Sequence, residues 1–287
     1  MAVHHRKVVS LRRDKKKSIH HITRHIWLRL LSKSLHPYLP PLRYGKHQIC
    51  RNVKYNLFPA LCKTLKNTDI IIYIMINELG KKLVKCDLDC EGINNNPKLG
   101  IIPRCLIQEN RKGEKRCIIV GLNPGKCKNK EKQYYLTKGI KFDSLSRFFW
   151  ESNLNNRPYF KRTRDLITLL GFDGNILWTD LAKCECLGKN GKIPIQTLRV
   201  CINKFLKKEI EFFKCSTIFA LGNVAFDFCA LSFPNHFIVG LPHPSGSYGV
   251  FYKLNQRVLS NPKHFADNIS ETKDAHNNYR AVHLSKV

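Results

Sequence analysis

The chain has 287 residues, and its 50 Lys and Arg against 21 Asp and Glu give a formal net charge of +29. That charge predicts a polyanionic partner, nucleic acid before an anionic membrane surface, although a lysine-rich compositional bias would also produce it. The longest apolar run, residues 70–76, is far shorter than the roughly 18 residues of a membrane-spanning helix, so we expect no membrane span.

Residues 1–74 differ in composition from the rest of the chain. They hold 16 Lys and Arg against two Asp, together with seven of the 12 histidines. Residues 26–35 have the pattern of a short basic amphipathic helix, and Pro37, Pro40 and Pro41 interrupt any longer one. We interpret residues 1–74 as a basic N-terminal extension that is poorly ordered or dispensable.

The only methionines are Met1 and Met75. Because the sequence after Met75 is typical of a first helix, we expect the functional domain to start near residue 75 and to span 75–265. The extension before it would then be dispensable, or not part of the translated protein. Without it the chain still has 34 basic against 19 acidic side chains, a net charge of +15. Residues 266–287 are expected to form a polar tail.

Within residues 75–265, apolar runs of strand length alternate with helical stretches. The expected strands are 117–120, 176–179, 217–221 and 237–240. The first expected helix runs from about residue 75 to about residue 85. Further helices are expected at 144–152, 162–170, 197–213 and 223–231, with a closing helix after residue 251. This alternation predicts the α/β class: a three-layer α/β/α sandwich around a four-stranded parallel sheet with right-handed crossovers.

The first expected strand runs into the turn Gly121-Leu122-Asn123-Pro124-Gly125. Lys126 follows it, but the glycines are too close together for a phosphate loop, and no Ser or Thr follows the lysine. Pro124 makes the turn rigid and the glycines permit close backbone approach, which would hold Asn123 at the strand mouth as a hydrogen-bonding group. An ordinary tight turn with a structural Asn is the alternative.

The last expected strand runs into Leu241-Pro242-His243-Pro244-Ser245-Gly246. Ligands of parallel sheets bind at the carboxyl ends of the strands. The prolines restrict the backbone on both sides of His243. These features favour a functional His243, although a lone histidine is more often structural.

Together these turns resemble the uracil-DNA glycosylase superfamily, whose motifs include G-x-N-P-G and H-P-S. Two further segments are similar to family motifs in the same order: Gly139-Ile140-Lys141-Phe142 to G-x-P-F, and the turn 220–225 to A-L-G-x-x-A. The similarity covers roughly residues 86–255. It implies a monofunctional DNA glycosylase, acting as a monomer, that flips a damaged or deaminated base out of DNA and hydrolyses its N-glycosidic bond.

The resemblance also implies roles for individual residues. Asn123 would orient a water toward the sugar, and His243 would stabilise charge on the departing base. The base would be bound by Gly121, Leu122, Phe142, Asp180 and Ser245, with Phe142 stacking on it. Lys126 and Tyr248 would contact DNA, and Tyr248 is the candidate for filling the vacated stack.

Twelve cysteines without a recognisable secretory signal are typical of a reducing compartment, so we expect a cytoplasmic or nucleoid-associated protein. Most are expected to be core thiols. The resemblance to the iron–sulfur branches implies a [4Fe–4S] cluster on Cys86, Cys90, Cys184 and Cys201. A zinc site, or no metal at all, is the alternative, and Cys186 is a competing ligand.

Asp180 departs from the family pattern, in which an Asn reads the uracil edge. An ionised Asp only accepts hydrogen bonds, so it would repel the O4 of uracil and favour a base that presents an N–H donor. A buried Asp180 with a raised pKa would be able to donate. The excised base and the strand preference are therefore left open, and a non-catalytic damaged-DNA or single-strand binder on the same fold is the alternative function.

Overall fold

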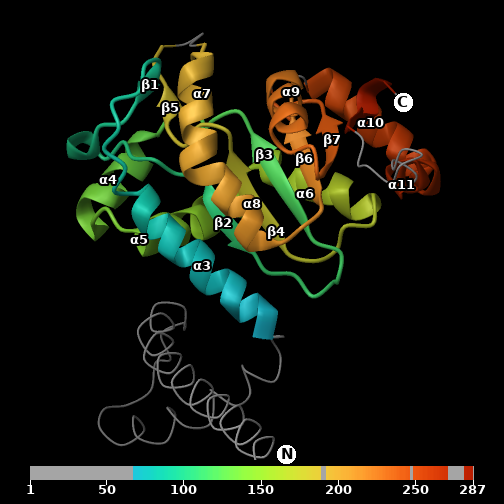
Figure 1. Ribbon diagram of the computed structural model, residues 1–287, viewed down its shortest axis with the longest axis horizontal. Coiled ribbons are helices and arrows are strands. Elements are labelled where there is room, and N and C mark those ends of the chain that lie inside the picture. The colour runs from blue at the N-terminus through green and yellow to red at the C-terminus, as the bar shows by residue number, and fades with distance from the viewer. Residues whose placement is uncertain (1–66, 189–191, 246–247, 271–280, 287) are drawn as a thin grey trace, which may run out of the picture. The chain divides into compact units, whose positions relative to one another are not determined.

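The computed structural model describes residues 67–188, 192–245, 248–270 and 281–286 (Figure 1). The chain divides into the units Met1–Pro59 and Ala60–Val287, and every described residue belongs to the second. Most of the expected basic extension, including the helix predicted at residues 26–35, lies outside the described residues.

A six-stranded mixed sheet forms the centre of the domain (Figure 1). Its strand order is β2-β4-β3-β6-β7-β8. The strands are β2 (Leu106–Glu109), β3 (Cys117–Gly121), β4 (Ile176–Asp180), β6 (Thr217–Leu221), β7 (Phe237–Leu241) and β8 (Ala281–His283). The four predicted strands are the four central ones, and all run parallel. The sequence missed both edges: β2 pairs antiparallel with β4, and β8 adds parallel to β7.

The four central strands are buried along their whole length, because helices cover the sheet. Continuous apolar runs are expected of parallel strands covered on both faces. The α/β sandwich predicted from these runs is therefore confirmed.

Nine α-helices fall among the described residues. They are α3 (Asn67–Leu83), α4 (Asn129–Lys138), α5 (Phe142–Phe148), α6 (Pro158–Leu169), α7 (Ile195–Cys201), α8 (Lys207–Phe213), α9 (Asn223–Ser232), α10 (Tyr248–Ser260) and α11 (Pro262–Ser270). Two π-helical turns extend this set: η2 (Phe149–Leu154) continues α5, and η3 (Ile202–Leu206) joins α7 to α8. No helix in the described ranges is long and apolar enough to cross a membrane.

Short elements occupy the connections. A separate two-stranded sheet pairs β1 (Ile93–Asn94) with β5 (Glu185–Cys186) in antiparallel fashion. The 3₁₀ turns are η1 (Pro97–Leu99) and η4 (Leu284–Lys286).

The domain boundary expected near residue 75 falls inside α3. That helix begins at Asn67, and both Ile72 and Ile76 are buried on it. An ion pair of 3.1 Å joins Asp69 of α3 to Arg116, just before β3. A domain starting at Met75 would therefore lack half of a helix that packs against the core.

The boundary expected at residue 266 is also misplaced, because it falls inside α11. Residues 281–286, expected in a polar tail, form β8 and η4 instead. The ring of His283 on β8 takes the space beside Gly240 of β7, where the position of an added Cβ would lie 2.4 Å from it. A three-residue edge strand carries too little periodicity to be seen in sequence.

Candidate active site

The two motif turns leave the same edge of the sheet. In the parallel register Gly121 lies beside Asp180, and Leu221 lies beside Leu241. The central pair β3 and β6 is aligned in the same way, with Val120 beside Ala220. All four central strands therefore end at one level, and the chain enters the turn of Asn123 and the turn of His243 there.

The first turn depends on the absence of a side chain at Gly121. An added Cβ there would lie 2.2 Å from Oδ1 of Asp180, so only glycine lets the carboxylate lie over the strand end. The turn is also tied to the segment after β4, because Leu181 N–H donates to Gly121 O at 2.9 Å and Ala182 N–H donates to Leu122 O at 2.9 Å. Nδ2 of the half-buried Asn123 donates to Pro124 O at 3.0 Å.

The second turn sets the tautomer of His243. Ser245 N–H donates to Nδ1 of His243 at 3.3 Å, and Oγ of Ser245 lies 3.2 Å from the same nitrogen. Burial lowers the pKa of His243 below its ordinary 6.5. A neutral ring that accepts at Nδ1 carries its proton on Nε2.

Tyr159, on the first turn of α6, links the two turns. Its hydroxyl lies 3.3 Å from the position of an added Cβ on Gly121, and its ring centroid lies 5.5 Å from that of His243. Burial raises the pKa of Tyr159 well above 10, and the nearby Asp180 and Cys105 raise it further. Sequence reasoning missed Tyr159, whose only local signal is its place after the proline that starts a helix.

Asp180 is buried, with 5% of its surface exposed. Burial raises its pKa from 3.8 to about 6, while a hydrogen bond with Cys105 and the charge of Lys183 act in the opposite direction. Cys105 has the left-handed backbone (φ 70°), which is uncommon for a residue with a side chain. The contact with Cys105 was not visible in the sequence, because Cys105 comes from another segment of the chain.

Close to Asp180, Lys183 and Glu209 form an ion pair of 2.8 Å in which both side chains are fully buried. Lys183 also donates to the Asp180 carbonyl at 2.8 Å and to Thr179 Oγ1. Thr179 Oγ1 in turn donates to Glu209 at 2.5 Å. This pair fixes the chain that leaves β4, directly after the position that the resemblance assigns to base reading.

Phe142 does not present a stacking face. It is only 5% exposed, and its ring packs on Gly80 of α3, where an added Cβ would lie 2.3 Å from it. A ring held in this way cannot also cover a base, so its predicted stacking role is wrong for this conformation. The sequence showed an aromatic residue after the first turn, but not that α3 covers it.

Three more residues were predicted to contact the base or the DNA, namely Leu122, Lys126 and Tyr248. Leu122 packs at the margin of the core, and Lys126 is exposed directly after the first turn. Tyr248 is the first residue of α10, and its side chain lies outside the described set. The DNA contacts of Lys126 and Tyr248 stay predictions.

The structure brings the four predicted cysteines close enough to influence one another. Burial, together with the nearby thiols of Cys201, Cys86 and Cys90, raises the pKa of Cys184 to about 12. Nζ of Lys204 lies 3.5 Å from Sγ of Cys86, so a cation faces this group of thiols.

Within the described ranges, no three His, Cys, Asp or Glu side chains are arranged around a point where a metal ion would sit. Sγ of Cys186 lies 4.0 Å from Gly188 O, and this thiol is not among the groups that shift the pKa of Cys184. The other four have the donor chemistry of a thiolate-bound group, but their described side chains are not gathered around a common point, so the cluster stays a prediction.

A comparison with protein families matches residues 109–267 to the uracil DNA glycosylase superfamily. The match covers more than half of the chain. This protein belongs to the uracil DNA glycosylase superfamily. A search among curated proteins finds no match.

The superfamily match contains Asn123, Asp180, His243 and the linking Tyr159. It begins at residue 109 and so leaves out Cys86 and Cys90. Membership supports the predicted glycosylase-like fold but leaves the predicted cysteine group untested.

Proposed function

We propose that this protein is a monofunctional DNA glycosylase that flips a damaged or deaminated base out of DNA and hydrolyses its N-glycosidic bond. The supporting observation is the convergence at one sheet edge: Tyr159 approaches both the strand end before Asn123 and the ring of His243. Membership of the superfamily supports the same reaction class.

In this proposal Asn123 orients the attacking water. Its Nδ2 is engaged by Pro124 O, so the side chain presents Oδ1 as a fixed acceptor for a water proton. An amide is a poor general base, so bond breaking runs ahead of water attack and the sugar gains oxocarbenium character.

His243 would stabilise the departing base. Because its Nδ1 accepts from Ser245, the proton that it would donate toward the O2 of a pyrimidine is the one on Nε2. A preorganised donor of this kind stabilises the charge that develops in the transition state. The neutral ring then acts as a hydrogen-bond donor and need not be a cation.

Asp180 would set the base preference. Its pKa of about 6 leaves it mostly ionised at pH 7.5 and mostly protonated at pH 5. The ionised form accepts hydrogen bonds only and favours a base that presents an amino group where uracil has O4. The protonated form can donate to O4 and favours uracil.

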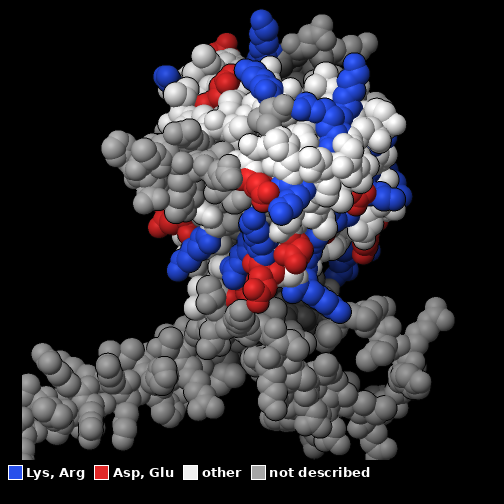
Figure 2. All heavy atoms as spheres, turned by 90° about the vertical axis from the view of Figure 1, so that its right-hand side faces the viewer, with Lys and Arg blue, Asp and Glu red and all other residues white. Residues whose placement is uncertain are grey.

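DNA contacts are expected on the basic segment that follows the first turn. Residues 126–141 contain six lysines, of which all but Lys132 are exposed, and their one acidic residue, Glu131, is buried. Lys and Arg side chains are also spread over the face shown in Figure 2, while Asp and Glu gather in smaller groups. Cations next to a base pocket hold the DNA backbone by neutralising phosphates.

The cysteine group would hold a [4Fe–4S] cluster, with zinc as the second candidate. The ligands would be Cys86, Cys90, Cys184 and Cys201. Such a group would act structurally, by joining the segment before β2 to the loop after β4 and to α7. Iron and zinc content of anaerobically purified protein, together with visible absorbance, distinguishes the candidates. A metal-free protein with four reactive thiols would refute both.

The glycosylase proposal is tested by abasic-site formation. Oligonucleotides carrying uracil, hypoxanthine, xanthine or mismatched thymine, in single and double strands, are incubated with the protein and cleaved with alkali. Asn123→Ala should lower the single-turnover rate on the order of 100-fold. The exposed Asn155 supplies a matched control, and Asn155→Ala should keep the wild-type rate.

One observation favours a second function, a damaged-DNA or single-strand binder without efficient chemistry. The buried carboxylate of Asp180 stands where the family has an amide. Tight binding to one of these oligonucleotides with no abasic product from any of them would support the binder and refute the glycosylase. An Asn123→Ala variant that cleaves at the wild-type rate would refute the mechanism alone.

A further inference from the structure

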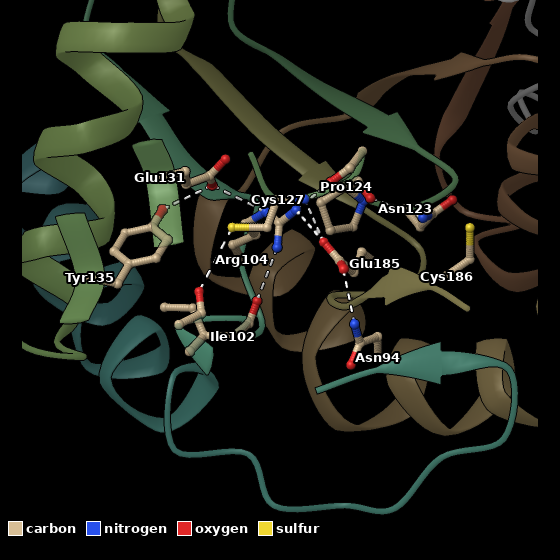
Figure 3. Close-up of polar contacts among 12 residues, drawn as sticks. Asn94, Ile102, Arg104, Asn123, Pro124, Cys127, Glu131, Tyr135, Glu185 and Cys186 are labelled. Carbon is tan, nitrogen blue, oxygen red and sulfur yellow. Dashed lines mark hydrogen bonds and ion pairs between the residues drawn. The ribbon is translucent and has the colours of Figure 1, made fainter. Parts of the chain in front are cut away.

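The turn that carries Asn123 leaves the sheet after Gly121, so strand pairing does not hold its far end. A buried polar network does so instead (Figure 3). At its centre is Arg104, which is 6% exposed and lies just before β2. The Nη2 group of Arg104 donates to the carbonyl oxygen of Gly125.

Glu185 also holds this turn, but it accepts a hydrogen bond from the backbone where Arg104 donates one. Its Oε2 accepts from Cys127 N–H at 2.5 Å and lies 3.1 Å from Nη2 of Arg104. Its Oε1 accepts from Nδ2 of Asn94 at 3.0 Å. The Arg104–Glu185 ion pair thus binds the carbonyl of Gly125 and the N–H of Cys127, two residues further along the chain.

Glu131, on α4, completes the network. Its Oε1 lies 3.3 Å from Nε of Arg104 and accepts from the hydroxyl of Tyr135 at 3.1 Å. Arg104 Nη1 also donates to Ile102 O at 3.4 Å. The guanidinium therefore bridges two carboxylates and two carbonyls from four different segments, an arrangement that the compact ammonium of a lysine would not reproduce.

We propose that Arg104 and Glu185 are positioning residues for the Asn123 turn, an inference that rests on the proposed glycosylase function. A buried ion pair contributes little net stability relative to apolar packing, but it specifies one geometry. Here the geometry is that of the residues directly after Asn123 and Pro124. Glu185 also lies between Cys184 and Cys186, so the network links the cysteine-bearing loop to the candidate catalytic turn.

The test uses two variants and one matched control in the full-length protein. Arg104→Lys keeps the charge but loses the fork, and Glu185→Gln keeps an acceptor but loses the charge. Tyr135→Phe removes a hydrogen bond of the same network that does not touch the turn. For each protein the assay measures the single-turnover cleavage rate, the Kd for DNA, the unfolding midpoint, and hydrogen exchange in peptides covering residues 121–128.

We expect Arg104→Lys and Glu185→Gln to slow cleavage on the order of 10- to 100-fold, because small displacements of a catalytic group cost rates of this size. The Kd for DNA should change by less than about threefold, since neither residue is exposed to DNA. Exchange at Gly125 and Cys127 should rise. Tyr135→Phe should keep the wild-type rate and exchange pattern.

Two results would overturn the proposal. One is wild-type cleavage by a folded Arg104→Lys or Glu185→Gln variant, and the other is an equal loss in Tyr135→Phe, which would show a general effect of core stability. If the wild-type protein cleaves none of the bases, the glycosylase function fails. The exchange measurement then still decides: unchanged protection at residues 125–127 in both variants refutes positioning, and local loss of protection supports it.

Discussion

Replacing Asp180 by Asn tests the electrostatics of the site directly. Asp180 is buried, and its pKa of about 6 compares with 3.8 for an ordinary Asp. The unfolded chain therefore ionises at lower pH than the folded protein, and the wild-type protein loses stability as the pH rises between these two values. Asn cannot ionise, so Asp180→Asn should remove that loss.

The size of the effect follows from the shift. About two pKa units correspond to about 3 kcal/mol, which is the penalty that Asp180 imposes once both states are ionised. Relative to the wild type, Asp180→Asn should thus be about 2 kcal/mol more stabilising at pH 7.5 than at pH 4. The exposed Asp165 on α6 offers a control, because Asp165→Asn removes a carboxylate without desolvation.

The assay is urea unfolding of the three proteins at several pH values between 4 and 8. A constant stability difference between Asp180→Asn and the wild type across this range would refute the argument from burial. The same variant should also lose the pH dependence of base choice. Uracil excision by the wild type should rise, relative to excision of a base with an amino group in place of O4, as the pH falls through 6, and excision by Asp180→Asn should favour uracil throughout.

Three further predictions concern the frame of the site. Gly121→Ala places a Cβ against the Asp180 carboxylate and should slow cleavage on the order of 10- to 100-fold. The control Gly125→Ala should be tolerated, because its Cβ meets nothing within 4 Å. Equal cleavage rates in the two variants would contradict the packing argument. A chain starting at Met75 should be less stable by about 3 kcal/mol or more than one starting at residue 67, because it loses the buried Ile70 and Ile72 of α3. Matching thermal midpoints of the two chains would contradict this. Lys183→Met should lower the free energy of unfolding by about 3–5 kcal/mol, because it leaves the buried Glu209 carboxylate unpaired. Adding Glu209→Gln should recover part of this loss in urea unfolding. No recovery would show that lost packing is the cause.

The centre of the fold could be read from the sequence because its strands are continuous apolar runs. The run at 117–120 and the run at 237–240 need burial on both faces, and only a covered parallel sheet provides it. The edge strands β2 and β8 could not be read, because strands of four and three residues leave no clear pattern. Their pairing is decided by the neighbouring strand.

The candidate site divides in the same way. Asn123 and His243 were found because Gly and Pro mark their turns locally. Tyr159, Cys105 and Arg104 were missed, since each acts through a partner on a distant segment. Phe142 was assigned to the pocket because its motif position was visible, while the helix that covers it was not.

The sequence by itself thus determined the sheet's central strands and the two rigid turns at their ends, since local periodicity and proline and glycine geometry suffice for both. Tertiary structure alone decided the ionisation of Asp180, the burial of Phe142 and the network behind the Asn123 turn. The physical reason is that desolvation and hydrogen bonding depend on which segments meet in space, and segments that are distant along the chain leave no mark of their meeting in either local sequence.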